Sequence, residues 1–342
     1  MKKIAAFALL ATAAAAASAQ SSVTLFGVVD ANVRHVKNGD NSVNSLSNNG
    51  LSSSRLGFRG IEDLGGGLKA SFWLEHGFNV DTGTPSDASR YWNRRSTVSL
   101  SGGFGELRLG RDFSPTYSTF AAFDAFGTNG VAAADKFNST LGSGADTGTR
   151  SDNLVSYFLP GSLGGLYGQV SVAPEEGTLG KKYAGARIGY AVGPLDVAVG
   201  YGRTDVAPVA GEDTFTTAIL GASYNFGVVK LSGYYQRNQA GDQKLTNVHV
   251  GATVPLGSGL LRASYVRADL EGRNAAGANV DANDADQFAI GYVHNLSKRT
   301  ALYATYAVVD NDGAAAFAVA GSPAMVAGRK STGYEFGIRH SF

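Results

Sequence analysis

The chain ends in the stretch YEFGIRHSF, residues 334–342, in which apolar and polar positions alternate. Tyr334, Phe336, Ile338, His340 and Phe342 share one parity, and glutamate, glycine, arginine and serine occupy the other. Successive side chains of a strand point to opposite faces, so this period of two predicts a β-strand with one apolar face. Gly-rich stretches with the same period, each about ten residues long, are typical of membrane-spanning barrels. They recur at residues 23–31, 53–60, 195–201 and 248–254.

Short turns separate these stretches and give the number of strands. Turns rich in Gly, Pro or Asn lie at 64–67, 102–103, 160–165, 193–194, 225–227, 255–259 and 295–298. Longer polar stretches lie between them, at 37–50, 81–90, 204–213, 271–284 and 311–330. Seven short turns with both termini on one side require eight hairpins. The sequence therefore predicts an all-β fold, a 16-stranded antiparallel transmembrane β-barrel.

One loop is much longer than a hairpin needs. Residues 112–149 fall between two of the predicted strands and include Tyr117, Phe120, Phe123 and Phe126. Exposed loops rarely carry so many aromatic side chains, and long loops in compact folds are usually functional. We therefore expect this third long loop to fold inward into the lumen; the alternative is an ordinary exposed loop.

The composition excludes several classes of function. The chain has 342 residues, 46 Gly, no Cys and a formal net charge of +1. The absence of cysteine excludes a disulfide framework, a thiolate zinc site, an iron–sulfur cluster and a cysteine nucleophile. The near-zero net charge gives no reason to expect nucleic acid as a partner.

The first residues have the pattern of a targeting segment. Lys2 and Lys3 precede an apolar stretch, residues 4–17, and Ala17-Ser18-Ala19 provides a small-x-small cleavage site. The alternative, a membrane anchor, needs a longer apolar segment to span about 30 Å of hydrocarbon. We expect residues 1–19 to be a signal peptide and residues 20–342 to form the barrel.

Several blocks of sequence carry a family resemblance. They are SVTLFG at 22–27, GFRGIEDLGGGLKA at 57–70, SLSGGFG at 99–105, NLSKRT at 295–300 and the terminal strand. Together they resemble the trimeric general diffusion porins of Gram-negative bacteria, in the same order from end to end. The resemblance implies a water-filled outer-membrane channel for small hydrophilic solutes and ions, a homotrimer, and an inward third loop that faces a basic wall.

The same resemblance implies the partners of the chain. They are outer-membrane lipid and lipopolysaccharide, periplasmic chaperones, and the barrel-assembly machinery, which would recognise the aromatic end at Phe342. Small solutes and anions would pass without any cofactor.

Five arginines are the candidates for the basic wall. Arg55 and Arg59 alternate with apolar Leu56 and Phe58, and an arginine on the lipid face would cost roughly 2–4 kcal/mol. Arg95 shares the parity of polar Thr97 and Ser99. Arg94 has the opposite parity, and the resemblance places it on the pore wall. Arg150 opens the strand after the long loop. The alternative for each is a solvated arginine at a loop end.

Asp124 is the acid that we expect to face these arginines. It lies near the apex of the long loop, with Asp112 and Asp135 at its flanks. A constriction with several arginines and one loop acid predicts a preference for anions.

Other functions have little support in the sequence. His76 follows Glu75, which points to the opposite face, so the two cannot form a catalytic pair within one strand. No Gly-x-Ser-x-Gly elbow or metal-spaced histidine pair occurs, so we expect no catalysis and no metal. Asp281, Asp284 and Asp286 fit a solvated loop better than a Ca²⁺ site. Two alternatives stay open: a substrate-specific outer-membrane porin, although only Tyr167 and Tyr234 line the lumen as aromatics, and a soluble secreted β-protein.

Overall fold

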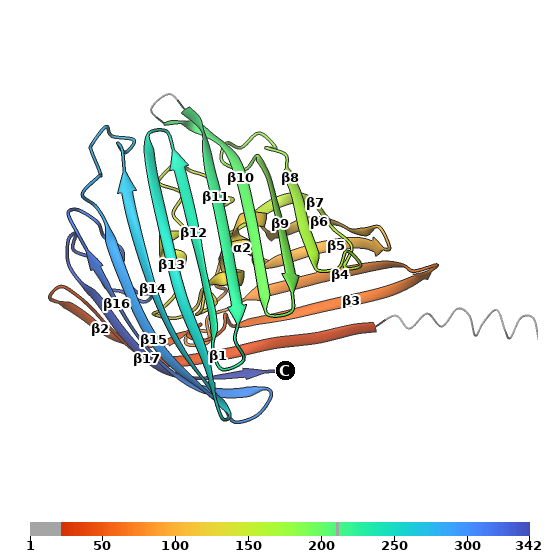
Figure 1. The fold of residues 1–342 in the computed structure, drawn as a ribbon, viewed down its shortest axis with the longest axis horizontal. Helices are drawn as coiled ribbons and strands as arrows, with labels where there is room; N and C mark the ends of the chain where they lie inside the picture. Colours follow the sequence, from red (N-terminus) through yellow and green to blue (C-terminus); the bar gives the residue numbers. More distant parts are fainter. Residues whose placement is uncertain (1–21, 210–211) are drawn as a thin grey trace, which may run out of the picture.

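The wall of the molecule is one antiparallel β-sheet that closes on itself (Figure 1). The structure is a computed structural model and describes residues 22–209 and 212–342. Seventeen strands lie within these residues. The first strand, β1 (Ser22–Asn38), pairs with the last strand, β17 (Ser331–Ser341), and this pairing closes the sheet into a barrel.

Two of the seventeen strands are halves of one wall strand. β2 (Asn41–Asn48) pairs with the C-terminal half of β1, and β3 (Arg55–Gly65) pairs with its N-terminal half. Residues 49–54 interrupt this wall strand. The barrel therefore has sixteen wall strands, as the seven short turns predicted.

The remaining wall strands follow in chain order, each antiparallel to its neighbours. They are β4 (Leu68–Gly77), β5 (Arg95–Gly102), β6 (Gly105–Phe113), β7 (Arg150–Phe158), β8 (Leu166–Ala173), β9 (Tyr183–Val192), β10 (Leu195–Val209), β11 (Glu212–Asn225), β12 (Lys230–Ala240), β13 (Gln243–Leu256), β14 (Gly259–Glu271), β15 (Ala285–Asn295) and β16 (Thr300–Asn311).

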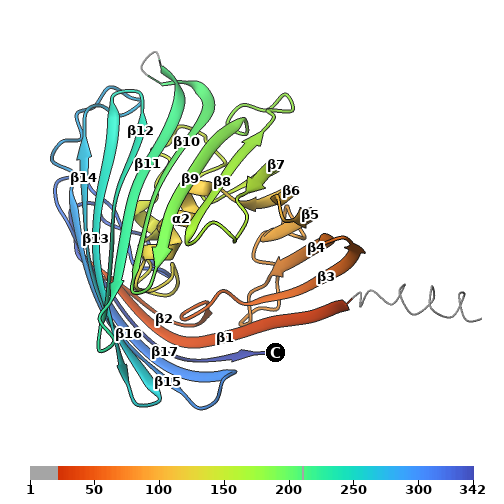
Figure 2. The same ribbon diagram turned by 45° about the vertical axis from the view of Figure 1, so that its right-hand side comes forward.

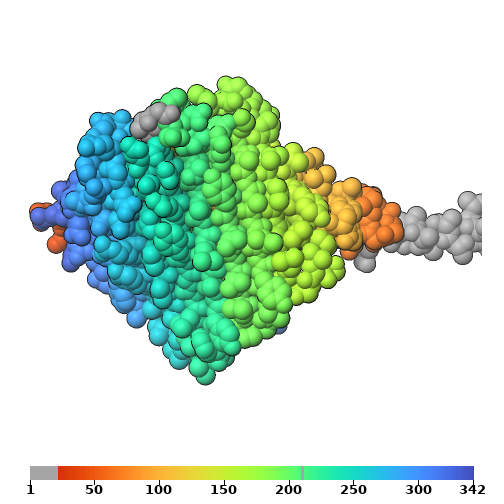
Figure 3. Space-filling view, turned by 45° about the horizontal axis from the view of Figure 1, so that its top comes forward, coloured from red at the N-terminus to blue at the C-terminus, as the bar shows by residue number. Residues whose placement is uncertain are grey.

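Alternation along each strand sorts apolar side chains to the outside and polar ones to the lumen. In β17, Tyr334, Phe336 and Ile338 are exposed on the outer wall, whereas Glu335 is fully buried inside. Figure 3 shows the outer face of the middle strands as a continuous wall. A wall with an apolar exterior and a polar interior is the arrangement of a barrel that spans a membrane.

The seven predicted short turns all connect neighbouring wall strands, and two of the predicted long loops are shorter than expected. Residues 37–50 fold mainly as the hairpin between β1 and β2, and most of residues 204–213 belongs to β10 and β11. Residues 37–50 are mostly polar, and residues 204–213 include Pro208 and Gly211, so both stretches have the composition of loops. Backbone pairing nevertheless continues through most of them.

The third long loop folds into the lumen, as predicted (Figures 1 and 2). It contains α2 (Pro115–Phe123) and a short 3₁₀ helix, η1 (Asp135–Phe137). The hydroxyl of Ser114 caps α2 by accepting a hydrogen bond from the backbone N–H of Tyr117 at 3.3 Å. The four phenylalanines of the loop are almost completely buried against inward-facing residues of the opposite wall: Phe120, Phe123, Phe126 and Phe137.

The predicted signal peptide, residues 1–19, lies outside the described residues. No helix within residues 22–209 and 212–342 is long and apolar enough to cross a membrane.

The chain terminus contributes directly to the closing seam. The backbone N–H of Phe342 donates to the carbonyl of Gly27 at 3.1 Å, and the N–H of Gly27 donates to the carbonyl of Phe342 at 3.1 Å. The ring of Phe342 lies over Gly27, where a Cβ atom would stand 2.4 Å from the ring. Gly27 therefore leaves the space that the terminal ring fills.

Deletion of Phe342 is expected to lower the stability of the barrel by about 3–4 kcal/mol. Two backbone hydrogen bonds are lost at about 1 kcal/mol each, together with about 1–2 kcal/mol from a partly buried ring. Urea unfolding of the refolded barrel in lipid vesicles, followed by tryptophan fluorescence, measures the change. Phe342→Ala keeps the backbone bonds and should lose only the contribution of the ring. A deletion variant as stable as the full chain would contradict this account of the seam.

Candidate pore constriction

A cavity of about 560 Å³ separates the arginine-bearing wall from the third loop. Arg55 of β3, Arg95 of β5 and Arg150 of β7 line it, together with Arg94, which precedes β5. Four of the five predicted arginines therefore meet at one place in the lumen. The fifth, Arg59, lies further along β3 and lines a second cavity.

Glu75 of β4 holds Arg55 and Arg94. Its Oε1 lies 2.5 Å from Nε of Arg94 and 3.6 Å from Nε of Arg55. Its Oε2 accepts a hydrogen bond from Nε1 of Trp73 at 3.1 Å. Gly57 lies opposite Glu75 in the neighbouring strand, and the ring of Phe26 fills the space that a side chain at Gly57 would need. One carboxylate thus fixes two guanidinium groups that would otherwise repel each other.

Arg94 faces the lumen although its parity predicts the lipid side. It lies one residue before β5 begins, so the alternation of the strand does not govern its direction. Its backbone carbonyl also accepts a hydrogen bond from Nε of Arg150 at 2.7 Å.

Arg95 and Arg150 stack on aromatic rings. The guanidinium carbon of Arg95 is 4.5 Å from the centre of the Trp73 ring, and that of Arg150 is 4.1 Å from the Phe113 ring. Arg95 also lies 3.5 Å from a carboxylate oxygen of Asp112. No carboxylate among the described residues lies within 4.0 Å of Arg150. Its charge is therefore held in place by stacking rather than by an acid.

Arg59 lines a second cavity, of about 550 Å³, together with Arg95, Arg108 and Glu106. Its guanidinium carbon lies 5.4 Å from the centre of the Phe26 ring and 5.3 Å from that of the Trp73 ring, and these two rings also contact each other. Arg95 and Trp73 belong to both cavities, so the two adjoin along the same wall. Together they are lined by six arginines and four acidic residues, a formal excess of two positive charges.

The structure does not place Asp124 opposite these arginines. Its carboxylate accepts hydrogen bonds from the backbone N–H groups of Phe126 and Thr128, both at 2.9 Å. One of its oxygens lies 3.6 Å from Nε2 of His249, on the far side of the loop. Asp124 therefore holds the end of α2 and does not line either cavity. The expectation that it faces the arginines does not match this position.

The loop presents little charge to the cavity. Among the described residues, Asp135 is the one charged residue that the loop contributes to the lining, beside Tyr117, Ala121, Gly127, Thr128, Asn129 and Thr149. Burial raises the pKa of Asp135 above its ordinary value. Burial also lowers the pKa of the neighbouring Lys136 to about 8. Besides Asp135, the charged residues that line this cavity are its four arginines and the carboxylates of Glu75 and Asp112.

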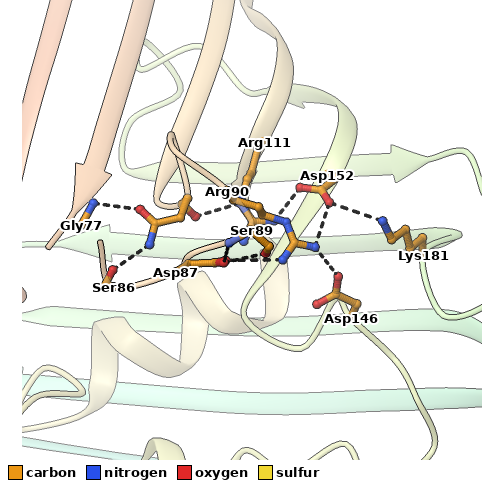
Figure 4. Close-up of polar contacts among 10 residues, drawn as sticks. Gly77, Ser86, Asp87, Ser89, Arg90, Arg111, Asp146, Asp152 and Lys181 are labelled. Atoms are coloured by element: carbon orange, nitrogen blue, oxygen red, sulfur yellow. Dashed lines mark hydrogen bonds and ion pairs between the residues drawn. The ribbon is translucent and has the colours of Figure 1, made fainter. Parts of the chain in front are cut away.

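A second group of ion pairs connects the loops above this wall (Figure 4). Arg90, in the loop between β4 and β5, pairs with Asp146 of the third loop at 2.8 Å and with Asp152 of β7 at 3.3 Å. Asp152 also pairs with Arg111 at 2.6 Å. The network ties the third loop to its neighbours outside the two cavities.

Sequence reasoning missed several residues of the site. Glu75 and Trp73 could have been found, because they alternate with apolar residues in β4 and share the parity of Gly77. Arg108 was not missed, because its parity is opposite to that of Leu107 and Leu109 and places it on the lumen side with Glu106. Ser52 and Ser53, which also line the first cavity, carried no signal, because they lie where a wall strand is interrupted.

The described residues contain no cluster of three or more His, Asp or Glu side chains placed to hold a metal ion. Arg267 pairs with Asp284 at 3.1 Å and with Asp286 at 3.2 Å, which occupies two of the three acids considered for Ca²⁺.

Comparisons with known proteins agree with this architecture. Residues 5–314 match the family model described as Gram-negative porin. The chain is 43% identical to outer membrane porin protein 32 of Delftia acidovorans, over all of this chain and 99% of that protein. The solved anion-selective porin from Comamonas acidovorans superposes with a TM-score of 0.85 at 40% identity, covering 94% of this chain and all of that one.

A more distant structure shares the fold alone. The trimer form of OmpT from Vibrio cholerae has a TM-score of 0.67 at 17% identity, with 94% and 99% of the two chains covered. The family match excludes the alternative of a soluble secreted β-protein, because members of this family are outer-membrane porins. The chain belongs to the Gram-negative porin family and is a 16-stranded β-barrel of the outer membrane.

Proposed function

We propose that the barrel is a general diffusion porin that admits small hydrophilic solutes and ions and prefers anions. The observation that carries this proposal is the excess of arginines over carboxylates around the two adjoining cavities. Arg59 and Arg150 have no carboxylate within 4.0 Å among the described residues, so their fields are not cancelled locally. The solved relative described as anion-selective supports the same preference.

Width and field select the solutes in this mechanism. Two unit charges 4 Å apart in water interact by only about 1 kcal/mol, so no single arginine dominates. Several arginines around one gap add their fields, and low-dielectric walls concentrate them. The Debye length of about 8 Å at physiological salt lets the field act across a narrow gap. Binding stays weak enough for release, which conduction requires.

The proposed channel has no catalytic cycle, cofactor or metal. Residues 1–19 would direct export and be removed, leaving residues 20–342 as the mature barrel. Outer-membrane lipid and lipopolysaccharide would surround the apolar exterior. Periplasmic chaperones would deliver the chain to the barrel-assembly machinery, which would read the end of β17 at Phe342.

A homotrimer is the proposed assembly. Small residues lie on the outer wall near the seam, where Ala31 lies opposite Ile338 and Ala304 opposite Phe336. Small side chains let two membrane walls approach closely.

Arg55→Ser combined with Arg59→Ser is expected to reduce the anion preference. Each arginine contributes on the order of 1 kcal/mol to anion attraction, so the permeability ratio of chloride to potassium should fall by about fivefold or more. The zero-current potential of the protein in a planar bilayer under a KCl gradient measures it. The paired control is Lys298→Ser with Arg299→Ser, in an exposed periplasmic turn, which removes the same charge far from the cavities. A cation-selective wild-type channel would overturn the proposal.

The trimer predicts a band near three times the monomer mass when unheated protein is run on a gel, and a monomer band after boiling. The interaction depends on folded walls, so heat should dissociate it. A monomer band alone in mild detergent would indicate a solitary barrel.

The proposed assembly signal predicts that cells carrying Phe342→Ala contain less of the protein in the outer membrane, because the machinery would no longer find an aromatic end. Membrane fractionation measures this, with Phe104→Ala in an exposed periplasmic turn as the control. Equal amounts of the wild type and Phe342→Ala would remove Phe342 from this role.

A further inference from the structure

We propose that residues 49–54 form a second inward wall of the constriction and that Asp30 is the residue that positions it. The inference rests on the proposed channel function and adds a determinant of pore width and selectivity outside the third loop.

The segment leaves the barrel wall because the pairing on its two sides does not match in length. β1 pairs with β3 up to Val28 and with β2 from Ala31 onward. Two residues of β1, Val29 and Asp30, therefore lie opposite the six residues 49–54. A wall strand cannot hold the additional residues in the plane of the sheet, so the chain bulges into the lumen.

The carboxylate of Asp30 organises this bulge. It is fully buried and accepts hydrogen bonds from three consecutive backbone N–H groups: Gly50 at 3.1 Å, Leu51 at 2.9 Å and Ser52 at 2.8 Å. The hydroxyl of Tyr303, from β16, donates to the same carboxylate. The backbone N–H groups of a segment that leaves a sheet lose their ladder partners and need another acceptor. The carboxylate of Asp30 is that acceptor for three of them.

The hydroxyl of Ser54 closes the base of the bulge. It accepts a hydrogen bond from the backbone N–H of Asp30 at 3.1 Å and donates one to the carbonyl of Asp30 at 3.2 Å. The main chain and the side chain of Asp30 thus hold both ends of the segment.

The other side of the bulge faces the pore and contacts the third loop. Ser52 and Ser53 line the first cavity. The Ser53 hydroxyl donates to the side-chain oxygen of Asn129 at 3.1 Å, and the backbone N–H of Gly130 donates to the carbonyl of Asn49 at 2.9 Å. The segment therefore supports the apex of the third loop from the wall.

The bulge also orients one of the pore arginines. Nη1 of Arg55 donates to the backbone carbonyl of Ser53 at 3.0 Å. Displacing the segment would release the Arg55 guanidinium on one side and the loop apex on the other. Asp30 acts through these groups without lining either cavity, so it is a positioning residue.

Asp30→Asn separates this role from a simple effect of charge. Loss of a negative charge beside the lumen would by itself strengthen anion preference. Loss of the acceptor should instead loosen the bulge, raise single-channel conductance and reduce the zero-current potential for anions. Asp40→Asn is the matched control: it makes the same charge change at an exposed turn of the same hairpin and should behave as wild type. A stronger anion preference at unchanged conductance in Asp30→Asn would overturn the positioning role.

A second variant tests the bulge with Asp30 intact, and it serves if Asp30→Asn fails to fold. The chain has no cysteine, so Ser53→Cys introduces the sole thiol. A negatively charged methanethiosulfonate should reduce the conductance of this variant stepwise, and a reductant should restore it. Ser42→Cys, exposed on β2, should be modified without any effect on conductance.

The outcomes separate this inference from the proposed function. An anion-preferring channel whose conductance is unchanged after modification of the cysteine in Ser53→Cys would overturn the second wall and leave the porin function standing. A wild-type protein without an anion-preferring channel would overturn the proposed function itself.

Discussion

The structure depends on the pairing of every backbone N–H and C=O group within the hydrocarbon of a membrane, where no water can replace a missing partner. A sheet meets this requirement only by closing, and here the seam between β1 and β17 closes it. Once the wall is closed, its outer parity has to be apolar. All polar chemistry is therefore confined to the lumen, and the alternation seen in residues 334–342 extends to the other strands.

A sixteen-stranded wall encloses a lumen too wide for side chains to fill. The described residues narrow it with the third loop and the bulge at 49–54, and buried carboxylates hold both. Glu335 accepts the backbone N–H of Val131 at 3.1 Å and pairs with Arg34 at 2.7 Å. Asp30 holds the bulge in the same manner. The burial of a carboxylate is compensated where several donors converge on it, and both sites satisfy this condition.

The number of strands, the inward loop and the lumen side of Arg55 and Arg59 could be predicted because each follows from the period of two or from the cost of a charge in lipid. The position of Arg94 followed from the family resemblance alone, and those of Asp124 and the bulge could not be predicted. Arg94 lies beyond the end of a strand, where parity does not apply. The carboxylate of Asp124 accepts hydrogen bonds from the backbone N–H groups of Phe126 and Thr128. These donors are close to Asp124 in sequence, so they compete for its carboxylate more effectively than a distant arginine does. The bulge arises because β1 pairs with β2 and with β3 in registers that leave two residues of β1 opposite six residues of the bulge. These registers are known only once the strands are seen paired in the barrel.

The position of the acids explains how a cluster of arginines can remain ordered in the proposed channel. Guanidinium groups without partners would repel one another and would bind a passing anion too tightly for conduction. Glu75 lies within 4.0 Å of two arginines, and Asp112 lies within the same distance of Arg95 and Arg108. Each carboxylate thereby fixes two cations while cancelling only one charge. The balancing acids therefore belong to the wall, on the same strand as an arginine or on a neighbouring one, where the register of the sheet fixes their spacing more firmly than a loop would.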